Sequence, residues 1–176
     1  DLPEGIKPPV AVLPNIINVE KFGFIKNPSK NRFVYVGRVT ENKGVDIAIE
    51  AAAKANLSLD LFGPIEGDEE WAAKINTLIS ENTNVKYWGK VDHDKVASCY
   101  DAVGSLLTMR EPEGFTSTVL ESVLSGTPVV TFGLGGAGDI VKDGVNGFKV
   151  KPGDMDALVK AINNVQTIDR AKCRDD

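Results

Sequence analysis

The sequence predicts a Rossmann-like α/β fold, in which a six-stranded, largely parallel sheet lies between two layers of helices. Six short runs of apolar and β-branched residues have the pattern of strands, and each precedes a segment with helical spacing. Strands that alternate with helices form right-handed βαβ units, which make the sheet parallel and cover both of its faces. The 176 residues are 42% hydrophobic and 26% charged, which indicates one folded domain with a sizeable core.

Residues 1–32 precede the first predicted strand and begin with prolines at positions 3, 8, 9 and 14. Because proline restricts φ and removes a backbone donor, we expect an extended connector with one short edge strand. The domain itself is expected to span 33–166, and 167–176 is expected to be a polar C-terminal tail. Because the sequence has no initiator Met and stops in this tail, we expect it to be part of a longer protein.

The alternation of strands and helices begins at residue 33. In the first predicted helix, Val45, Ala48, Ile49 and Ala52 keep the spacing of a buried helical stripe. The expected strands are 33–37, 57–63, 84–89, 105–109, 128–132 and 147–150. The expected helices are 43–55, 67–80, 92–103, one that begins near 116–118, 138–143 and 154–165.

Composition excludes several classes of function. A net charge of -5 gives no general attraction for nucleic acid or an anionic membrane. No apolar run approaches the ~20 residues that span a bilayer, and the N-terminus lacks a signal sequence, so we expect a cytoplasmic protein without a transmembrane segment. Cys99 and Cys173 are expected to be structural thiols, and a single histidine, His93, argues against triads and His-based metal sites.

The segment 111–126, EPEGFTSTVLESVLSG, is the strongest candidate for a ligand platform. Pro112 and Gly114 mark a turn, after which the hydroxyls at positions 116–118 suit helix capping. One face of the predicted helix is apolar. The other has small polar side chains and a single carboxylate, Glu121, which suits the wall of a cleft. The helix start also offers unpaired amides and a partial positive charge that attract a phosphate.

In folds of this class, ligands bind outside the carboxyl ends of the strands. The loop after the first strand contains Arg38 and Lys43. These two cations are able to hold a diphosphate, one through its planar fork and the other as a point charge. Taken alone, two basic residues on a loop are more often surface cations, but their position at this edge favours a site.

The run 133–138 satisfies the G-x-G-x-x-G pattern of dinucleotide-binding proteins. The helix after it has room for only about six residues before Asp143-Gly144, which is too short for that motif's helix. We therefore interpret the glycines as a tight turn or a close approach of two backbones. Their amides remain candidates for contacts with phosphate or sugar. An NAD- or FAD-dependent oxidoreductase stays an alternative.

Glu113 and Glu121 invite comparison with the paired carboxylates of glycosidases. If both were helical, eight residues would separate them by about 12 Å, beyond the roughly 5 to 9.5 Å that those mechanisms use. Two carboxylates at that span suit hydrogen bonds to the hydroxyls of two different rings. A nucleotide sugar has two such rings with a diphosphate between them.

Four motifs resemble those of the retaining GT-B glycosyltransferases, especially glycosyltransferase family 4. They are the G-R…K-G of 37–44, Y-W-G-K-V at 87–91, the E-x7-E of Glu113 and Glu121, and G-G…D-I-V…D-G-V-N-G-F at 135–148. Together with VLPNIINVEKF at 12–22, the resemblance covers nearly the whole chain. It implies a hexosyltransferase that moves a sugar from a nucleotide-sugar donor to an acceptor with retention.

The resemblance also implies the roles of individual residues. Arg38 and Lys43 would bind the donor diphosphate with the amides of Ser117 and Thr118. Glu113 would hold the donor sugar, Glu121 the ribose, and the backbone near Lys90 the base. The implied donor site comprises Gly37, Arg38, Lys43, Lys90, Val91, Glu113, Gly114, Phe115, Thr116, Ser117, Thr118 and Glu121, with Arg38, Lys43 and Glu113 as the catalytic residues, no cofactor and no metal ion.

The sequence departs from the family pattern in three places. Thr116 replaces a usual glycine, which would narrow the sugar pocket, Ile16 replaces another, and Gly138-Asp139 replaces the common proline and glutamate. The resemblance covers only the C-terminal, donor-binding half of a GT-B fold. The acceptor-binding N-terminal domain is missing, so this chain alone is expected to turn over little. Alternatives of the same fold are a sugar-nucleotide epimerase and a non-catalytic nucleotide-sugar binding module.

Overall fold

The computed structural model describes residues 16–28 and 31–175, and within them the predicted six-stranded parallel sheet is confirmed. The strand order is β3-β2-β1-β4-β5-β6, the order of a doubly wound Rossmann fold, and all neighbouring strands are parallel. The strands are β1 (Arg32–Val36), β2 (Ser58–Phe62), β3 (Val85–Gly89), β4 (Gly104–Leu107), β5 (Val129–Thr131) and β6 (Gly147–Lys149).

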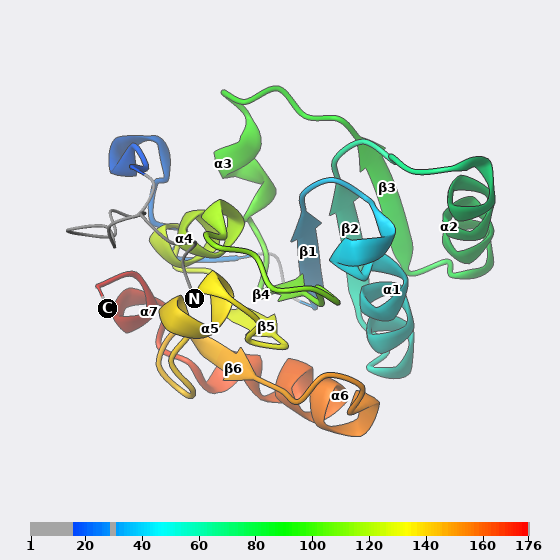
Figure 1. The fold of residues 1–176 in the computed structure, drawn as a ribbon. Coiled ribbons are helices and arrows are strands. Elements are labelled where there is room, and N and C mark those ends of the chain that lie inside the picture. Colours follow the sequence, from blue (N-terminus) through cyan, green and yellow to red (C-terminus); the bar gives the residue numbers. More distant parts are fainter. Residues whose placement is uncertain (1–15, 29–30, 176) are drawn as a thin grey trace, which may run out of the picture.

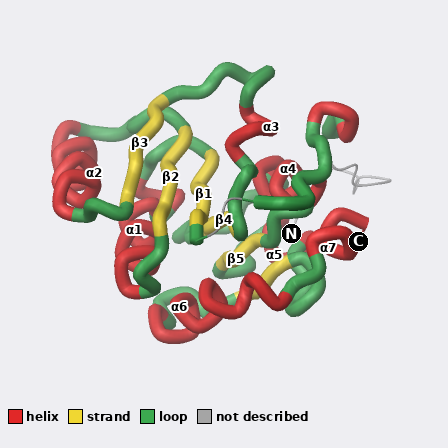
Figure 2. Tube along the Cα trace, turned by 180° about the vertical axis from the view of Figure 1, so that it is seen from behind, coloured by secondary structure: helices red, strands yellow, loops and turns green. Residues whose placement is uncertain are grey.

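Helices cover both faces of the sheet, as Figure 1 and, from behind, Figure 2 show. The buried strands therefore have apolar side chains on both faces: Phe33 and Tyr35 of β1 point into one core and Val34 into the other. The first face is covered by α1 (Val45–Lys54), α2 (Glu69–Glu81) and α6 (Met155–Asn164). The second is covered by α3 (Val96–Cys99), α4 (Ser117–Leu124), α5 (Gly136–Ile140) and α7 (Arg170–Asp175).

The first predicted helix is divided at Gly44. A short 3-10 helix, η2 (Glu41–Lys43), precedes it, and Gly44 itself adopts a left-handed conformation with φ 65°. Its carbonyl accepts a hydrogen bond of 2.7 Å from Thr108 Oγ1, and a Cβ at Gly44 would lie 2.0 Å from the Thr108 carbonyl oxygen. Only glycine fits here, and this close approach brings Lys43 to the loop that follows β4.

The helix expected at 92–103 is wrong in length, because α3 spans only Val96–Cys99. Two turns flank it: the Lys95 amide donates to the Asp92 carbonyl at 2.9 Å, and the Ala102 amide donates to the Tyr100 carbonyl at 2.8 Å. The second turn reverses the chain directly into β4. Pairing in the sheet thus overrides the local helical pattern.

Residues 170–175, which we expected to lie in a polar tail, form α7 and are part of the fold. Arg170 donates to the carbonyls of Ile25 and Ala102, both at 3.0 Å, and Arg174 donates to the carbonyl of Phe22 at 2.8 Å. These hydrogen bonds connect the two arginines of α7 to the segment before β1 and to the residue two positions before β4.

The segment before β1 forms a 3-10 helix, η1 (Val19–Lys21). Residues 16–28 contain no strand. An edge strand before residue 16 would lie outside the described residues.

Within the described part of the chain, no helix is both long and apolar enough to cross a membrane. Cys99 and Cys173 are both buried and form no disulfide, in agreement with the prediction of structural thiols.

Candidate functional site

The sheet has one topological switch point, between β1 and β4. The chain leaves β1 toward α1 on one face and leaves β4 toward α4 on the other. In folds of this class, ligands bind at the carboxyl edge beside such a switch point. The predicted site residues stand on the loops after β1, β3 and β4 and on the first turns of α4, and all of these loops leave the same edge.

An ion pair joins the two diverging loops. Lys43 Nζ donates a hydrogen bond to Glu113 Oε1, and Met109 Sδ lies 4.0 Å from the same nitrogen. The Lys43 side chain is 14% exposed and that of Glu113 31%, so water screens this pair less than a surface pair. The sequence predicted both residues as parts of the site but did not predict that they would contact each other.

Arg38 differs from Lys43 in that its side chain is 60% exposed. Its Nη1 is 3.4 Å from Glu66 Oε2, and its main-chain carbonyl accepts a hydrogen bond of 2.8 Å from the Tyr35 hydroxyl. Burial, and then the negative charge of Glu113, raise the pKa of Tyr35 well above its usual value. The phenol therefore stays a donor and fixes the backbone of Arg38, while the guanidinium remains able to turn toward a ligand.

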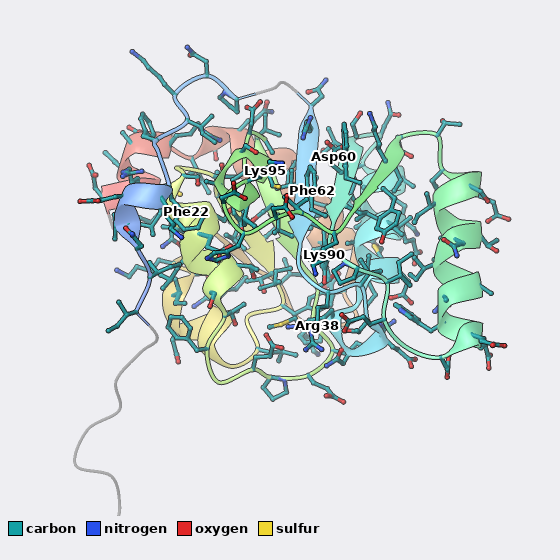
Figure 3. The ribbon with its side chains drawn as sticks, turned by 90° about the horizontal axis from the view of Figure 1, so that it is seen from above. Phe22, Arg38, Asp60, Phe62, Lys90 and Lys95 are labelled. Atoms are coloured by element: carbon teal, nitrogen blue, oxygen red, sulfur yellow. The ribbon has the colours of Figure 1, made fainter. Side chains whose placement is uncertain are left out.

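The loops after β1, β2 and β3 are joined to one another at the carboxyl edge. The Gly37 amide donates to the Phe62 carbonyl at 2.9 Å, and the Gly63 amide donates to the Gly89 carbonyl at 2.8 Å. Lys90 is exposed beyond this edge, and Val91 packs against the core beneath it. Figure 3 shows Arg38 and Lys90 at this edge, whereas Asp60 lies further back along β2.

The glycine run is a close approach of two backbones, as we interpreted it. The Gly136 amide donates to the Glu113 carbonyl at 2.7 Å, and a Cβ on Gly135 would lie 2.2 Å from that carbonyl oxygen. Gly138 donates to the Gly135 carbonyl at 2.8 Å, so the expectation that the run offers its amides to a ligand is wrong for these two. The glycine run instead packs directly against the backbone of Glu113.

The prediction that one face of α4 lines a cleft is partly wrong. Ser122 and Ser125 are fully buried: Ser122 Oγ is 2.8 Å from Ser105 Oγ and donates to the Thr127 carbonyl at 2.6 Å. These hydroxyls hold the helix to the sheet and to the turn after it. Only Thr118 and Glu121 on this face remain partly exposed, one turn nearer the carboxyl edge.

The start of α4 has no side-chain cap. Thr116 is the N-cap residue, but its hydroxyl makes no capping bond; it is 3% exposed and its Oγ1 has no hydrogen-bond partner among the described residues. The predicted capping role of this hydroxyl is therefore wrong. Gly114 is exposed, whereas Phe115 and Ser117 are partly buried beside it.

The two glutamates are held by different partners. Glu113 lies before α4 in a β-bridge with Gly135, so it is not helical. Glu121, within α4, accepts a 2.7 Å hydrogen bond at Oε2 from the Tyr100 hydroxyl. The sequence did not identify Tyr100, because nothing in its local pattern distinguishes it from a core aromatic residue.

No group of three or more His, Cys, Asp or Glu side chains that could hold a metal ion occurs in the described ranges.

Comparisons with known proteins show which family and which fold this chain resembles. The family model described as glycosyl transferases group 1 matches residues 17–175. An uncharacterized glycosyltransferase of Methanocaldococcus jannaschii is 30% identical over 170 residues, which cover 93% of this chain and 46% of the relative. A glycogen synthase of Mycobacterium tuberculosis is 27% identical over 169 residues, 89% of this chain and 39% of that protein.

Solved structures show the same fold. Anabaena HepE, crystallised in complex with UDP-glucose, superimposes with a TM-score of 0.78 at 21% identity, over 90% of this chain and 50% of that one. Sucrose-phosphate synthase from Thermosynechococcus elongatus has a TM-score of 0.75 at 26% identity, over 90% of this chain and 43% of that one. The chain therefore spans half or less of the length of these proteins.

The contact between the glycine run and Glu113 predicts a large effect of Gly135→Ala. Gly135 has φ 59°, and the new Cβ would also meet the Glu113 backbone, so we expect a loss of about 2–5 kcal/mol in the free energy of unfolding. Gly144→Ala is the matched control, since Gly144 has φ 75° and nothing within 4 Å of its Cβ position, and should lose only about 1–2 kcal/mol. Urea titration measures both. Equal losses in the two variants would contradict the close approach.

Proposed function

This chain belongs to the glycosyl transferases group 1 family and folds as one half of a GT-B glycosyltransferase, and on that premise we propose that it is the donor-binding half of a retaining hexosyltransferase. The observation that carries the proposal is the pairing of Lys43 with Glu113 across the switch point, beside the start of α4. A cation for phosphate and a carboxylate for hydroxyls stand together there. The UDP-glucose bound by Anabaena HepE is a ligand of this chemistry.

We propose one placement of a nucleotide sugar along this edge. Lys43 and Arg38 take the diphosphate, with the amides of Ser117 and Thr118 at the start of α4. Glu113 and the backbone from Gly114 through Phe115 to Thr116 face the sugar. Glu121 takes the ribose hydroxyls, and the backbone of Gly37, Lys90 and Val91 borders the diphosphate and the base.

In the proposed reaction, the bond between the anomeric carbon and the diphosphate oxygen breaks, and that carbon forms a bond to an acceptor hydroxyl oxygen with retention. The proton of the acceptor hydroxyl leaves with the nucleoside diphosphate. Negative charge grows on the departing nucleoside diphosphate. Two cations beside that group would stabilise the growing charge more than a helix terminus does, about 3–4 kcal/mol for a donor held in place against ~0.3–2 kcal/mol for the dipole. With this charge covered by side chains, we propose that the donor needs no metal ion or further cofactor.

The same proposal assigns the remaining parts of the chain. The residues before β1 connect to an N-terminal domain that binds the acceptor, and the donor domain extends from β1 through α7. The acceptor site would lie between the two halves, so this chain alone would bind the donor weakly and turn over little. The closure of the second half over the carboxyl edge would exclude water from the sugar.

If Lys43 stabilises the leaving group, Lys43→Ala should lower turnover more than it weakens donor binding. In the protein that joins both halves, we expect kcat to fall about 10²–10³-fold, with a change in donor affinity of roughly tenfold or less. Steady-state kinetics and donor titration separate the two effects. Lys160→Ala, an exposed lysine on α6, should change neither quantity. An unchanged kcat in Lys43→Ala would remove this role.

Glu113 and the diphosphate should compete for Lys43, because the ion pair must open when the donor binds. Glu113→Gln removes the competing charge but also a strong acceptor for sugar hydroxyls, each worth about 1.5–3 kcal/mol. We therefore expect the variant to bind a nucleoside diphosphate as tightly as the unchanged chain or more tightly, and the matching nucleotide sugar about tenfold more weakly. Calorimetric titration with both ligands tests this. Equal weakening of both would show that Glu113 does not distinguish sugar from diphosphate.

A further inference from the structure

The carboxylate of Glu121 accepts a hydrogen bond from Tyr100, a residue that none of the sequence motifs identified. The Tyr100 hydroxyl lies 2.7 Å from Glu121 Oε2 and 3.3 Å from the Thr118 carbonyl oxygen. Tyr100 follows α3, so this contact reaches α4 from a separate element of the fold. The hydroxyl therefore touches both the carboxylate and the first turn of the helix that bears it.

The position of this hydroxyl is fixed by its surroundings. Tyr100 is 1% exposed, and its ring makes an edge contact with Phe22, with centroids 6.3 Å apart. Burial, followed by the charge and hydrogen bond of Glu121, raises the pKa of Tyr100 well above its usual value. The phenol therefore stays protonated and donates its one proton to Glu121, the nearer of its two acceptors.

The contact leaves the carboxylate with one defined free oxygen. The terminal torsion of a glutamate is broad and roughly two-fold when nothing holds it. With Oε2 bound to Tyr100, that torsion is restricted, and Oε1 accepts no hydrogen bond from the described residues. A carboxylate fixed before the ligand arrives loses less conformational entropy when it binds.

We propose that Tyr100 is a positioning residue that aims Glu121 at the paired hydroxyls of a ribose and so makes the site select ribonucleotides over deoxyribonucleotides. This inference rests on the proposed function, because it takes the ribose end of a nucleotide sugar as the ligand of Glu121. Tyr100 does not touch the ligand. It acts by keeping one carboxylate oxygen in place and by tying Glu121 to the turn of α4 that carries Thr118.

The test is a double-mutant cycle of Tyr100→Phe and Glu121→Ala on this chain, titrated with UDP, GDP and ADP, each beside its 2′-deoxy form. The unchanged chain should bind one ribonucleotide about tenfold more tightly than the deoxy form. Tyr100→Phe should remove most of that preference while leaving affinity for the deoxy form nearly unchanged. Once Glu121 is alanine, adding Tyr100→Phe should have no further effect on binding, since Tyr100 acts through the carboxylate.

Tyr87→Phe is the matched control. Its hydroxyl also bonds within the protein, to the Gly63 carbonyl at 3.0 Å, but it lies on the opposite face of the sheet. This variant should keep the ribose preference. Melting temperatures of all variants show whether the loss of either hydroxyl affects stability alone.

Several results would overturn the inference. Equal weakening of ribo and deoxy forms by Tyr100→Phe, or effects that simply add to those of Glu121→Ala, would reduce Tyr100 to a structural role. Binding without any ribose preference in the unchanged chain would refute this inference and leave the proposed function standing, whereas no binding of any of the three nucleotides would refute both.

A second measurement covers the case in which Tyr100→Phe does not fold. Fluorotyrosine placed at position 100 keeps the hydroxyl, and its fluorine resonance reports on the contact with Glu121. The resonance should shift more with the ribonucleotide than with the deoxy form, and equal shifts would contradict the inference.

Discussion

The ion pair of Lys43 and Glu113 is the side-chain contact that brings opposite charges together between the two loops flanking the switch point. A doubly wound sheet sends its chain to opposite faces on the two sides of the switch point, so these loops diverge. One backbone hydrogen bond still links them, because the Arg110 amide donates to the Asn42 carbonyl at 2.8 Å. The half-buried pair adds a charged side-chain contact to this backbone hydrogen bond. It also places one positive and one negative group where a ligand with a diphosphate and hydroxyls would need them. The two side chains thus contact each other in the chain without ligand, and the proposal has them separate and turn to the donor when it binds.

The structure supports each member of this pair from behind. Gly44 approaches the end of β4 so closely that no side chain fits there. This close approach brings the neighbouring Lys43 to the loop that follows β4. Gly135 and Gly136 approach the backbone of Glu113 in the same way from the loop after β5. Rigid backbone contacts of this kind keep charged groups in place without large motions. In α4, the serine hydroxyls contact the sheet and the turn after the helix. Glu121 lies nearer the carboxyl edge, where the Tyr100 hydroxyl holds its carboxylate.

Periodicity and position predicted the sheet, most helices and the loops that carry the site, because burial on two faces leaves a strong alternating pattern in the sequence. Prediction from periodicity and position failed where long-range contacts override that pattern. Residues 170–175 look polar, yet the two arginines of α7 find carbonyl acceptors from distant segments, and no local signal shows those acceptors. Ser122 resembled a cleft residue because small hydroxyls suit both a cleft and a close helix–sheet contact. Tyr100 and the pairing of Lys43 with Glu113 depend on side-chain geometry across the fold, which one sequence does not contain.

The proposed function depends above all on the binding of a nucleoside diphosphate at the carboxyl edge around the switch point. The most direct measurement is an amide-resolved NMR titration of this chain with UDP, GDP, ADP and NAD. We expect one nucleoside diphosphate to shift the resonances of Lys43, Ser117 and Thr118, together with those of Lys90 and Val91. Shifts confined to residues 133–138 and produced by NAD alone would contradict this expectation and favour a dinucleotide-binding role for the glycine run.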